Sequence, residues 1–176
     1  MIDKYYYTDK EIEKLCKSIE ILVDTREKVN QHITDWFDKK SIPWRKKALK
    51  NGDYSFMVPK NLELNIERDL FFDKEIMIER KKDLDELAGN ITTNRTRFEE
   101  EMATFSGKKY LLLEVSTYPD IVDGKYRSKL SNKSYMGTVH SFNHKYNLEV
   151  VYMPNQNYSG IWIYGTFFYY LKNMLR

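Results

Sequence analysis

Glu79 and Lys81 stand two residues apart at the end of the apolar run IMIERK, residues 76–81. Side chains in a strand alternate between its two faces, so this spacing predicts the carboxylate and the ammonium on one face and Arg80 on the other. A carboxylate can hold a divalent cation, and a lysine beside it can orient an attacking water and offset charge that develops on phosphorus. The pair therefore fits metal-assisted phosphodiester hydrolysis. The simpler alternative is a solvated ion pair, because Glu-x-Lys is common by chance.

Two further acids are candidates for the same centre, since one carboxylate is too few to hold Mg²⁺. Asp53 directly follows the turn signal Asn51-Gly52, and Asp24 closes the apolar run EILVD. Each has an ordinary alternative, because Asp after Gly is common turn chemistry and Asp24 can begin the next helix. We expect Asp53 to meet Glu79 around one cation, with Lys81 beside them and Asp24 as a third candidate.

The elements that would position these residues alternate between strands and helices. Period-2 and continuous apolar runs predict strands at residues 20–24, 44–49, 53–58, 75–80, 110–115 and 148–153. Apolar residues at helical spacing, with capping boxes at Thr8 and Asp83, predict helices near residues 9–19, 29–37, 84–91, 95–105, 134–146 and from about 158. Asn51-Gly52 predicts a tight turn between the second and third strands. This order indicates an α/β fold in which helices cover a sheet, as one domain of residues 1–176.

Composition sets broad limits on function. The 29 Lys and Arg residues exceed the 26 Asp and Glu residues by a formal net charge of +3, which is compatible with a nucleic-acid partner without requiring one. Cys16 is the single cysteine, so one chain can form neither a disulfide nor a cysteine-based zinc site. The sequence shows no signal peptide and no apolar run near the roughly 20 residues that cross a bilayer. We expect no membrane partner and a reducing, cytoplasmic compartment.

The chain contains, in order, the blocks VDTRE (23–27), LKNGDYSF (49–56), IERKKDLDELA (78–88), RF (97–98) and YLLLE (110–114). These five blocks resemble the nuclease domain of the XPF-type structure-specific endonucleases. That family is marked by Gly-Asp and then Glu-Arg-Lys-x-x-x-Asp within a restriction-endonuclease-like fold. Gly52-Asp53 and the run from Glu79 to Asp85 match both motifs without a gap, and the resemblance extends over about residues 19–115. It implies an α/β fold with a central mixed sheet flanked by helices.

The resemblance implies a role for each residue of the catalytic set. Asp53 and Glu79 would bind Mg²⁺ or Mn²⁺, assisted by the backbone carbonyl of Arg80. Lys81 would act on the water and on the scissile phosphate. Asp24 would complete the acidic cluster.

Other matching residues are implied to support the site. Arg26 and Glu27 would support it or position DNA, and Asp85 would orient the strand–helix junction. Arg97 would contact phosphate or serve the structure. Glu114 ends a core strand where relatives often carry a Glu, and it is given no catalytic role.

The chain departs from the family after residue 115. Members that cut flaps or nicked forks usually carry a tandem helix-hairpin-helix module there, and the isolated glycines of this segment do not fit that pattern. The chain therefore resembles a stand-alone form of the nuclease domain, found in phages and mobile elements among others. The aromatic segment NYSGIWIYGTFFYYLKNML (157–175) fits a homodimer surface and fits equally well a helix packed on its own sheet.

Two further groups each have two interpretations. Arg45, Lys46 and Lys47, together with Lys50, lie just before Asp53 and would suit phosphate contact with DNA, or would guard an exposed strand edge. His140 and His144 have the i, i+4 spacing of a zinc pair, but they lack the Glu of the zinc-protease pattern and fit ordinary surface or core histidines better.

These observations lead to the hypothesis of a Mg²⁺- or Mn²⁺-dependent DNA endonuclease that acts on branched or distorted duplex in repair or recombination, with a phage as one setting. Two alternatives stay open. One is a nuclease of simple duplex or single strands, and the other is a catalytically silent subunit that binds DNA or a partner. Intact Asp53, Glu79 and Lys81 favour an active enzyme.

Overall fold

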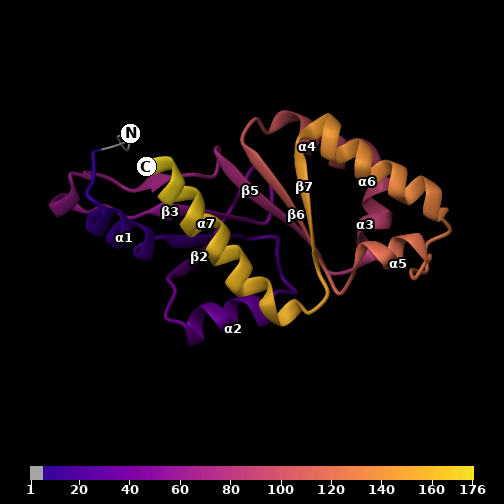
Figure 1. Cartoon of the computed structure of the whole chain (residues 1–176), viewed down its shortest axis with the longest axis horizontal. Coiled ribbons are helices and arrows are strands. Elements are labelled where there is room, and N and C mark those ends of the chain that lie inside the picture. Colours follow the sequence, from indigo (N-terminus) through magenta and orange to yellow (C-terminus); the bar gives the residue numbers. More distant parts are fainter. Residues whose placement is uncertain (1–5) are drawn as a thin grey trace. The chain divides into compact units, whose positions relative to one another are not determined.

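The computed structural model describes residues 6–176 and divides into two compact units (Figure 1). The first unit contains the chain up to Asp73 together with Gly160–Arg176, and the second contains Lys74–Ser159. Residues 1–5 of the expected domain lie outside the described residues. That residues 1–176 act as one domain stays a prediction.

The strands of the first unit surround β1. Its apolar residues are fully buried, and it pairs in parallel with β2 on one edge and antiparallel with β3 on the other. The expected turn is present, with Gly52 at a φ of 69°. The strands that it connects do not pair with each other, because β1 lies between them. The bounds are β1 Glu20–Asp24, β2 Trp44–Lys47, β3 Tyr54–Val58 and β4 Leu70–Phe71, which pairs antiparallel with β3.

Helices α1 (Asp9–Lys17), α2 (Gln31–Lys39) and α7 (Ser159–Leu175) and the 3-10 turn Leu62–Leu64 complete this unit, apart from Ser159. The capping box of Thr8 forms as expected. Helix α2 begins two residues later than the pattern indicated, and Val29 is 73% exposed. One stripe of α7 is fully buried, and its Phe167 ring lies 5.2 Å from the Phe56 ring of β3.

The second unit has three parallel strands with helices gathered beside them (Figure 1). Its core joins apolar residues of β5, β6 and β7 to the buried faces of the helices, including Met77, Leu111, Phe98 and Phe142. The elements are β5 Ile76–Lys81, α3 Leu84–Ile91, α4 Arg95–Thr104, β6 Lys108–Glu114, α5 Tyr118–Val122, α6 Asn132–Tyr146, β7 Leu148–Met153 and the 3-10 turn Gln156–Tyr158.

The observed elements confirm the predicted α/β class, with parallel and antiparallel strands covered by helices. Every predicted strand and helix is present within a few residues. The short elements β4 and α5 were not predicted. In the part of the chain that the structure describes, no helix is both long and apolar enough to span a bilayer.

Candidate active site

Glu79 and Lys81 lie at the carboxyl end of β5, where every residue is buried. Lys81 Nζ donates to Glu79 Oε1 over 2.6 Å, and the two residues are 6% and 7% exposed. The expected placement on one face is thus confirmed. Lys81 Nζ also lies 5.8 Å from the ring centre of Phe98 on α4. The pair is therefore held inside the fold, since a buried charge requires a partner of opposite sign.

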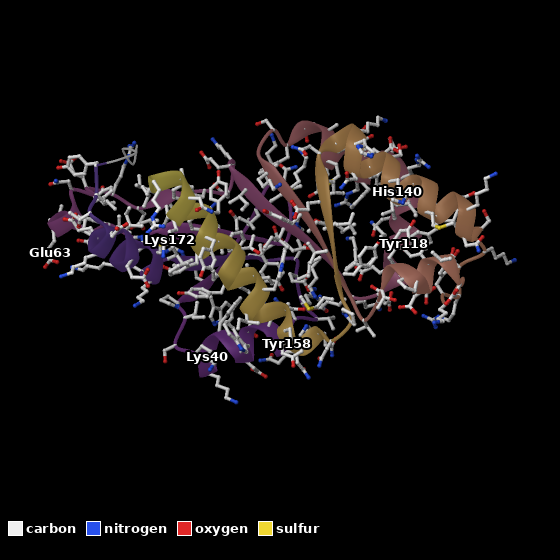
Figure 2. All side chains as sticks on the ribbon, in the orientation of Figure 1. Lys40, Glu63, Tyr118, His140, Tyr158 and Lys172 are labelled. Atoms are coloured by element: carbon white, nitrogen blue, oxygen red, sulfur yellow. The ribbon has the colours of Figure 1, made fainter. Side chains whose placement is uncertain are left out.

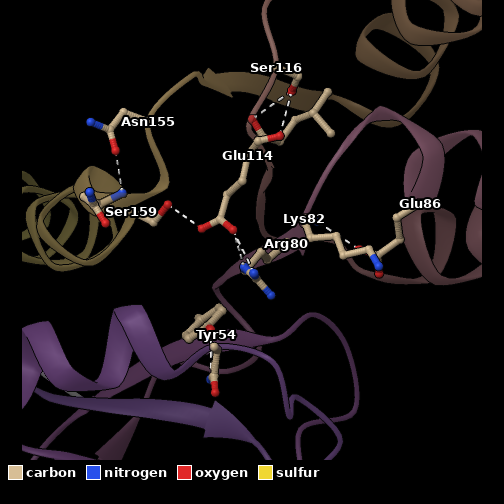
Figure 3. A network of polar contacts seen from close by, with 11 residues as sticks. Tyr54, Arg80, Lys82, Glu86, Glu114, Ser116, Asn155 and Ser159 are labelled. Carbon is tan, nitrogen blue, oxygen red and sulfur yellow. Dashed lines mark hydrogen bonds and ion pairs between the residues drawn. The ribbon is translucent and has the colours of Figure 1, made fainter. Parts of the chain in front are cut away.

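Arg80 points to the opposite face of β5 and binds Glu114 at the end of β6. Its Nε and Nη2 donate to Glu114 Oε2 over 3.0 and 2.7 Å, while the Ser159 hydroxyl donates to Oε1 (Figure 3). All three residues are buried. Removal of either charge would leave the other uncompensated in a region of low dielectric. Glu114 thus fixes Arg80, and with it the strand that carries Glu79 and Lys81.

The turn from β5 into α3 is held by Asp83 and Glu86, while Asp85, the last acid of the Glu-Arg-Lys-x-x-x-Asp motif, binds a later segment of the chain. Asp83 caps α3 by accepting the backbone N–H of Glu86 over 2.8 Å, and the Glu86 carboxylate accepts the backbone N–H of Lys82 over 2.9 Å. Two residues further on, Asp85 accepts the backbone N–H and Nε of Arg127 over 2.7 and 2.9 Å. The hydrogen bond with the Arg127 side chain is the largest cause that lowers the pKa of Asp85.

Asp24 ends β1 in the first unit, and its side chain is fully buried. Oδ1 accepts from the backbone N–H and Nε of Arg26, and Oδ2 accepts from Arg26 Nη2 and the backbone N–H of Leu49, over 2.6–3.0 Å. Burial acts to raise the pKa of Asp24, but the hydrogen bonds from Arg26 and Leu49 outweigh it and lower the pKa. Both oxygens of this carboxylate therefore anchor the chain around β1. Glu27, the last acid of this block, donates its backbone N–H to the Asp24 carbonyl.

The backbone of Asp53 lies opposite that of Asp24, across the pairing of β1 with β3. The two strands are antiparallel with Val23 opposite Tyr54, and the N–H of Asp24 donates to the Asp53 carbonyl over 2.8 Å. Asp24 and Asp53 therefore face each other at the end of this ladder. Two acids that are far apart in sequence are thus adjacent within the first unit.

The predicted ligand set comes from both units, with Asp24 and Asp53 in the first and Glu79 in the second. Within either unit, over residues 6–176, no group of three or more His, Cys, Asp or Glu side chains is arranged to hold a metal ion. The three-acid centre stays a prediction. His140 hydrogen-bonds the Tyr118 hydroxyl over 2.9 Å (Figure 2), a contact that fits the ordinary histidine expected from the sequence.

The cations expected to contact DNA differ in their surroundings. β2 is the outermost strand of its unit, as expected for a guarded edge. Arg45 pairs with Glu20 over 3.2 Å and Lys47 pairs with Asp73 over 2.5 Å, so acids of the same unit already neutralise them. Three of the expected cations are exposed, namely Lys46, Lys50 and Arg97. These three are thus the better candidates for contact with phosphate.

Residues 123–133 after α5, which we call the basic loop, are a feature that the sequence motifs did not indicate. Its backbone is bound by Asp85 across 42 and 43 positions of sequence. An excess of Lys and Arg in residues 124–133 was the available signal. Its place next to α3 depends on the fold and could not be read from spacing.

The solved structures that are similar to this chain include two of XPF. XPF from Aeropyrum pernix matches with a TM-score of 0.61 and 15% identity over 84% of this chain and 63% of that chain. XPF from Aeropyrum pernix in complex with DNA matches with a TM-score of 0.64 and 16% identity over 89% of this chain and 67% of that chain. This chain thus spans about two thirds of their length, and the likeness confirms the predicted fold.

A comparison with curated proteins found no match. The ERCC4 domain matches residues 23–166. That range contains the whole Gly-Asp and Glu-Arg-Lys-x-x-x-Asp motif set, and it continues beyond the expected limit of residue 115 through β7 and into α7. The predicted resemblance to XPF-type nuclease domains is confirmed, and this protein belongs to the ERCC4 domain family.

Proposed function

We propose that this protein is a metal-dependent endonuclease that hydrolyses phosphodiester bonds in DNA. The observation that carries the proposal is the buried Glu79–Lys81 pair at the end of β5, inside an ERCC4 domain. Lys81, whose Nζ lies 2.6 Å from Glu79 Oε1, would orient water and offset negative charge at phosphorus. Arg80 and Glu114 would keep the pair in place from the other face of the strand.

The donor chemistry fits Mg²⁺ or Mn²⁺, which prefer oxygen ligands. The carboxylates of Asp53 and Glu79 and the carbonyl of Arg80 would hold the cation, which when bound would activate water and stabilise charge on the phosphate. Asp24 would join them only by exchanging hydrogen bonds that its oxygens now accept from Arg26 and Leu49. We therefore assign Asp24 mainly to the support of Asp53 and Arg26.

The proposed substrate is branched or distorted duplex DNA, as the name of the family of structure-specific enzymes suggests. One of the similar structures is XPF from Aeropyrum pernix in complex with DNA, which supports DNA as the partner. A nuclease without structural preference is the competing proposal. A panel of labelled forks, flaps, four-way junctions and linear duplex would separate the two, because only a structure-specific enzyme would leave linear duplex uncut.

We also propose that α7 forms a homodimer contact. One stripe of the helix is buried in the first unit, while Tyr158 just before it, and Ile161 and Tyr169 within it, are 60%, 51% and 60% exposed. Exposed large apolar side chains on one helix fit a protein interface. Sedimentation of the parent and of Ile161→Glu/Tyr169→Glu would test this, since only the parent should dimerise.

The activity is tested with Asp53→Asn and Lys81→Ala, assayed with Mg²⁺, with Mn²⁺ and with EDTA. Each variant should lower turnover by at least about 100-fold, the order expected when one group that stabilises transition-state charge is removed. EDTA should abolish cleavage by the parent. Lys108→Ala is the matched control, because Lys108 lies on β6 and forms an exposed pair with Glu149. Parent-like cleavage by both site variants, with melting temperatures unchanged, would contradict the assignment.

A further inference from the structure

The basic loop, residues 123–133 (DGKYRSKLSNK), runs from the end of α5 into the first turn of α6, which holds Lys133, and carries a concentrated positive charge. Lys125, Arg127, Lys129 and Lys133 stand against one acid, Asp123, which gives the segment a net charge of +3 from four cations and one anion. This equals the formal net charge of the whole chain. One short segment thus carries a net positive charge as large as that of the whole chain.

The basic loop is held in a defined shape by its own apolar and backbone contacts. The Tyr126 hydroxyl donates to the Leu130 carbonyl over 2.9 Å, and the Tyr126 ring lies 5.0 Å from that of Tyr135. Tyr126 and Leu130 pack against the core of the second unit. Gly124 adopts a φ of +68°, which glycine accepts without strain. A loop fixed in this way presents its cations with little loss of entropy on binding.

Asp85 ties the basic loop to the motif that carries Lys81. Its carboxylate accepts the backbone N–H groups of Arg127 and Ser128 over 2.7 and 3.2 Å, and accepts Arg127 Nε over 2.9 Å. Asp85 lies in the first turn of α3, which directly follows β5. The basic loop therefore contacts α3, the helix that begins three residues after Lys81.

The four cations are not equally neutralised. Lys125 pairs with Asp120 and Asp123 over 3.3 Å, and Arg127 pairs with Asp85 although its side chain remains 88% exposed. Lys129 and Lys133 are exposed, and neither forms an ion pair with an acid of residues 6–176. Exposed cations without acidic neighbours bind phosphates by releasing condensed counterions. Contacts of this kind position a protein on nucleic acid without reading its sequence.

We propose that the basic loop is a DNA-backbone site in which Lys129 and Lys133 bind phosphates close to the phosphodiester that Glu79 and Lys81 act on. The proposal rests on the proposed function, which it extends by a binding surface outside the motif residues named above. Asp85 fixes the offset between the bound phosphates and the site of cleavage. The basic loop is thus a positioning surface for the cut strand.

The test compares Lys129→Ala/Lys133→Ala with Lys39→Ala/Lys40→Ala, in an Asp53→Asn background that does not cut. Lys39 and Lys40 are exposed residues at the end of α2, so the control removes the same charge elsewhere. Binding of a labelled duplex is measured over a series of monovalent salt concentrations. Loss of two phosphate contacts should reduce the slope of log K against log salt by about 2. The control should keep the parent's slope, and Lys129→Arg/Lys133→Arg should restore it.

The outcomes separate the two proposals. If the double alanine variant keeps the parent's slope while Lys81→Ala still abolishes cleavage, the basic loop is not a DNA site and the proposed function stands. If the parent binds no duplex at any salt concentration and cuts no substrate, the proposed function fails. If the control loses as much slope as the loop variant, the effect is one of net charge and the assignment to the basic loop is wrong.

Discussion

The charged residues at the end of β5 are buried in two pairs, Glu79 with Lys81 and Arg80 with Glu114, and the sequence predicted the first pair but not the second. The alternation of side chains along one strand predicted Glu79 and Lys81 on the same face, and the hydrogen bond between their side chains confirms this prediction. The partner of Arg80 was not predicted, because Glu114 lies 34 residues away and reaches Arg80 only through the pairing of β5 with β6. Local spacing thus predicts contacts within a strand, while contacts across strands require the register.

Asp24 gives a prediction for stability against pH. Its folded-state pKa is lowered, so its contribution is complete above the ordinary value of 3.8 and is lost as pH falls through the folded-state pKa. Asp24→Asn should therefore lower the free energy of unfolding by about 2 kcal/mol near neutral pH, the order for hydrogen bonds to a buried charged group. The difference from the parent should vanish in acid, where Asp24 is protonated.

Urea unfolding of both proteins over a pH series measures this difference. Asp123→Asn is the matched control, since Asp123 is an exposed acid whose side chain is 55% accessible. Its curve should follow the parent's at every pH. If Asp24→Asn lowers the free energy of unfolding equally in acid and at neutral pH, the effect comes from altered packing and not from the lost charge.

At the scale of elements, the long amphipathic segments were predictable and the short ones were not. The caps of Thr8 and Asp83 fix the starts of two helices, and both caps form as expected. β4 contains only Leu70 and Phe71, and α5 only five residues, which are too few to show a period. The tight-turn signal was real, yet it did not produce a hairpin, because the buried strand β1 pairs with both strands that the turn connects.

Replacing glycine by alanine at two positions should change the free energy of unfolding in opposite directions. A Cβ at Gly107 would lie 2.3 Å from the Glu75 carbonyl oxygen, where β6 enters its pairing with β5, whereas a Cβ at Gly137 on α6 meets nothing within 4 Å. Gly107→Ala should lower the free energy of unfolding by about 1–3 kcal/mol, as overpacking does. Gly137→Ala should raise it by roughly 0.5–1 kcal/mol, because alanine favours helix.

Denaturant midpoints of the parent and the two variants provide the measurement. Because the substitution is chemically identical, each variant serves as the control of the other. Equal shifts in the same direction would show that the close approach at Gly107 does not limit the pairing of β5 with β6.

At the scale of the whole molecule, the chain leaves the first unit at Asp73 and returns to it at Gly160. No local pattern in the sequence indicated this, since strands and helices alternate in the same way throughout. The return is visible only in packing, where Phe167 of α7 contacts Phe56 of β3. The arrangement gives a prediction about cooperativity.

Phe167→Ala should lower the free energy of unfolding by about 3–5 kcal/mol, the usual effect of removing a buried aromatic ring. In native-state hydrogen exchange, the loss of protection should be greatest in β1 and β3, although they lie more than a hundred residues earlier. Phe142→Ala, in the core of the second unit, should instead weaken β5–β7. Uniform loss of protection in both variants would mean that the two units open as one.

The place of α7 has a consequence for biosynthesis. A ribosome makes β1–β4 early, but the helix that covers Phe56 is made only after the entire second unit. During that interval the nascent first unit exposes apolar rings to its surroundings, and such surfaces are where aggregation begins. The nascent chain therefore depends on chaperones for as long as the second unit takes to be translated and to fold.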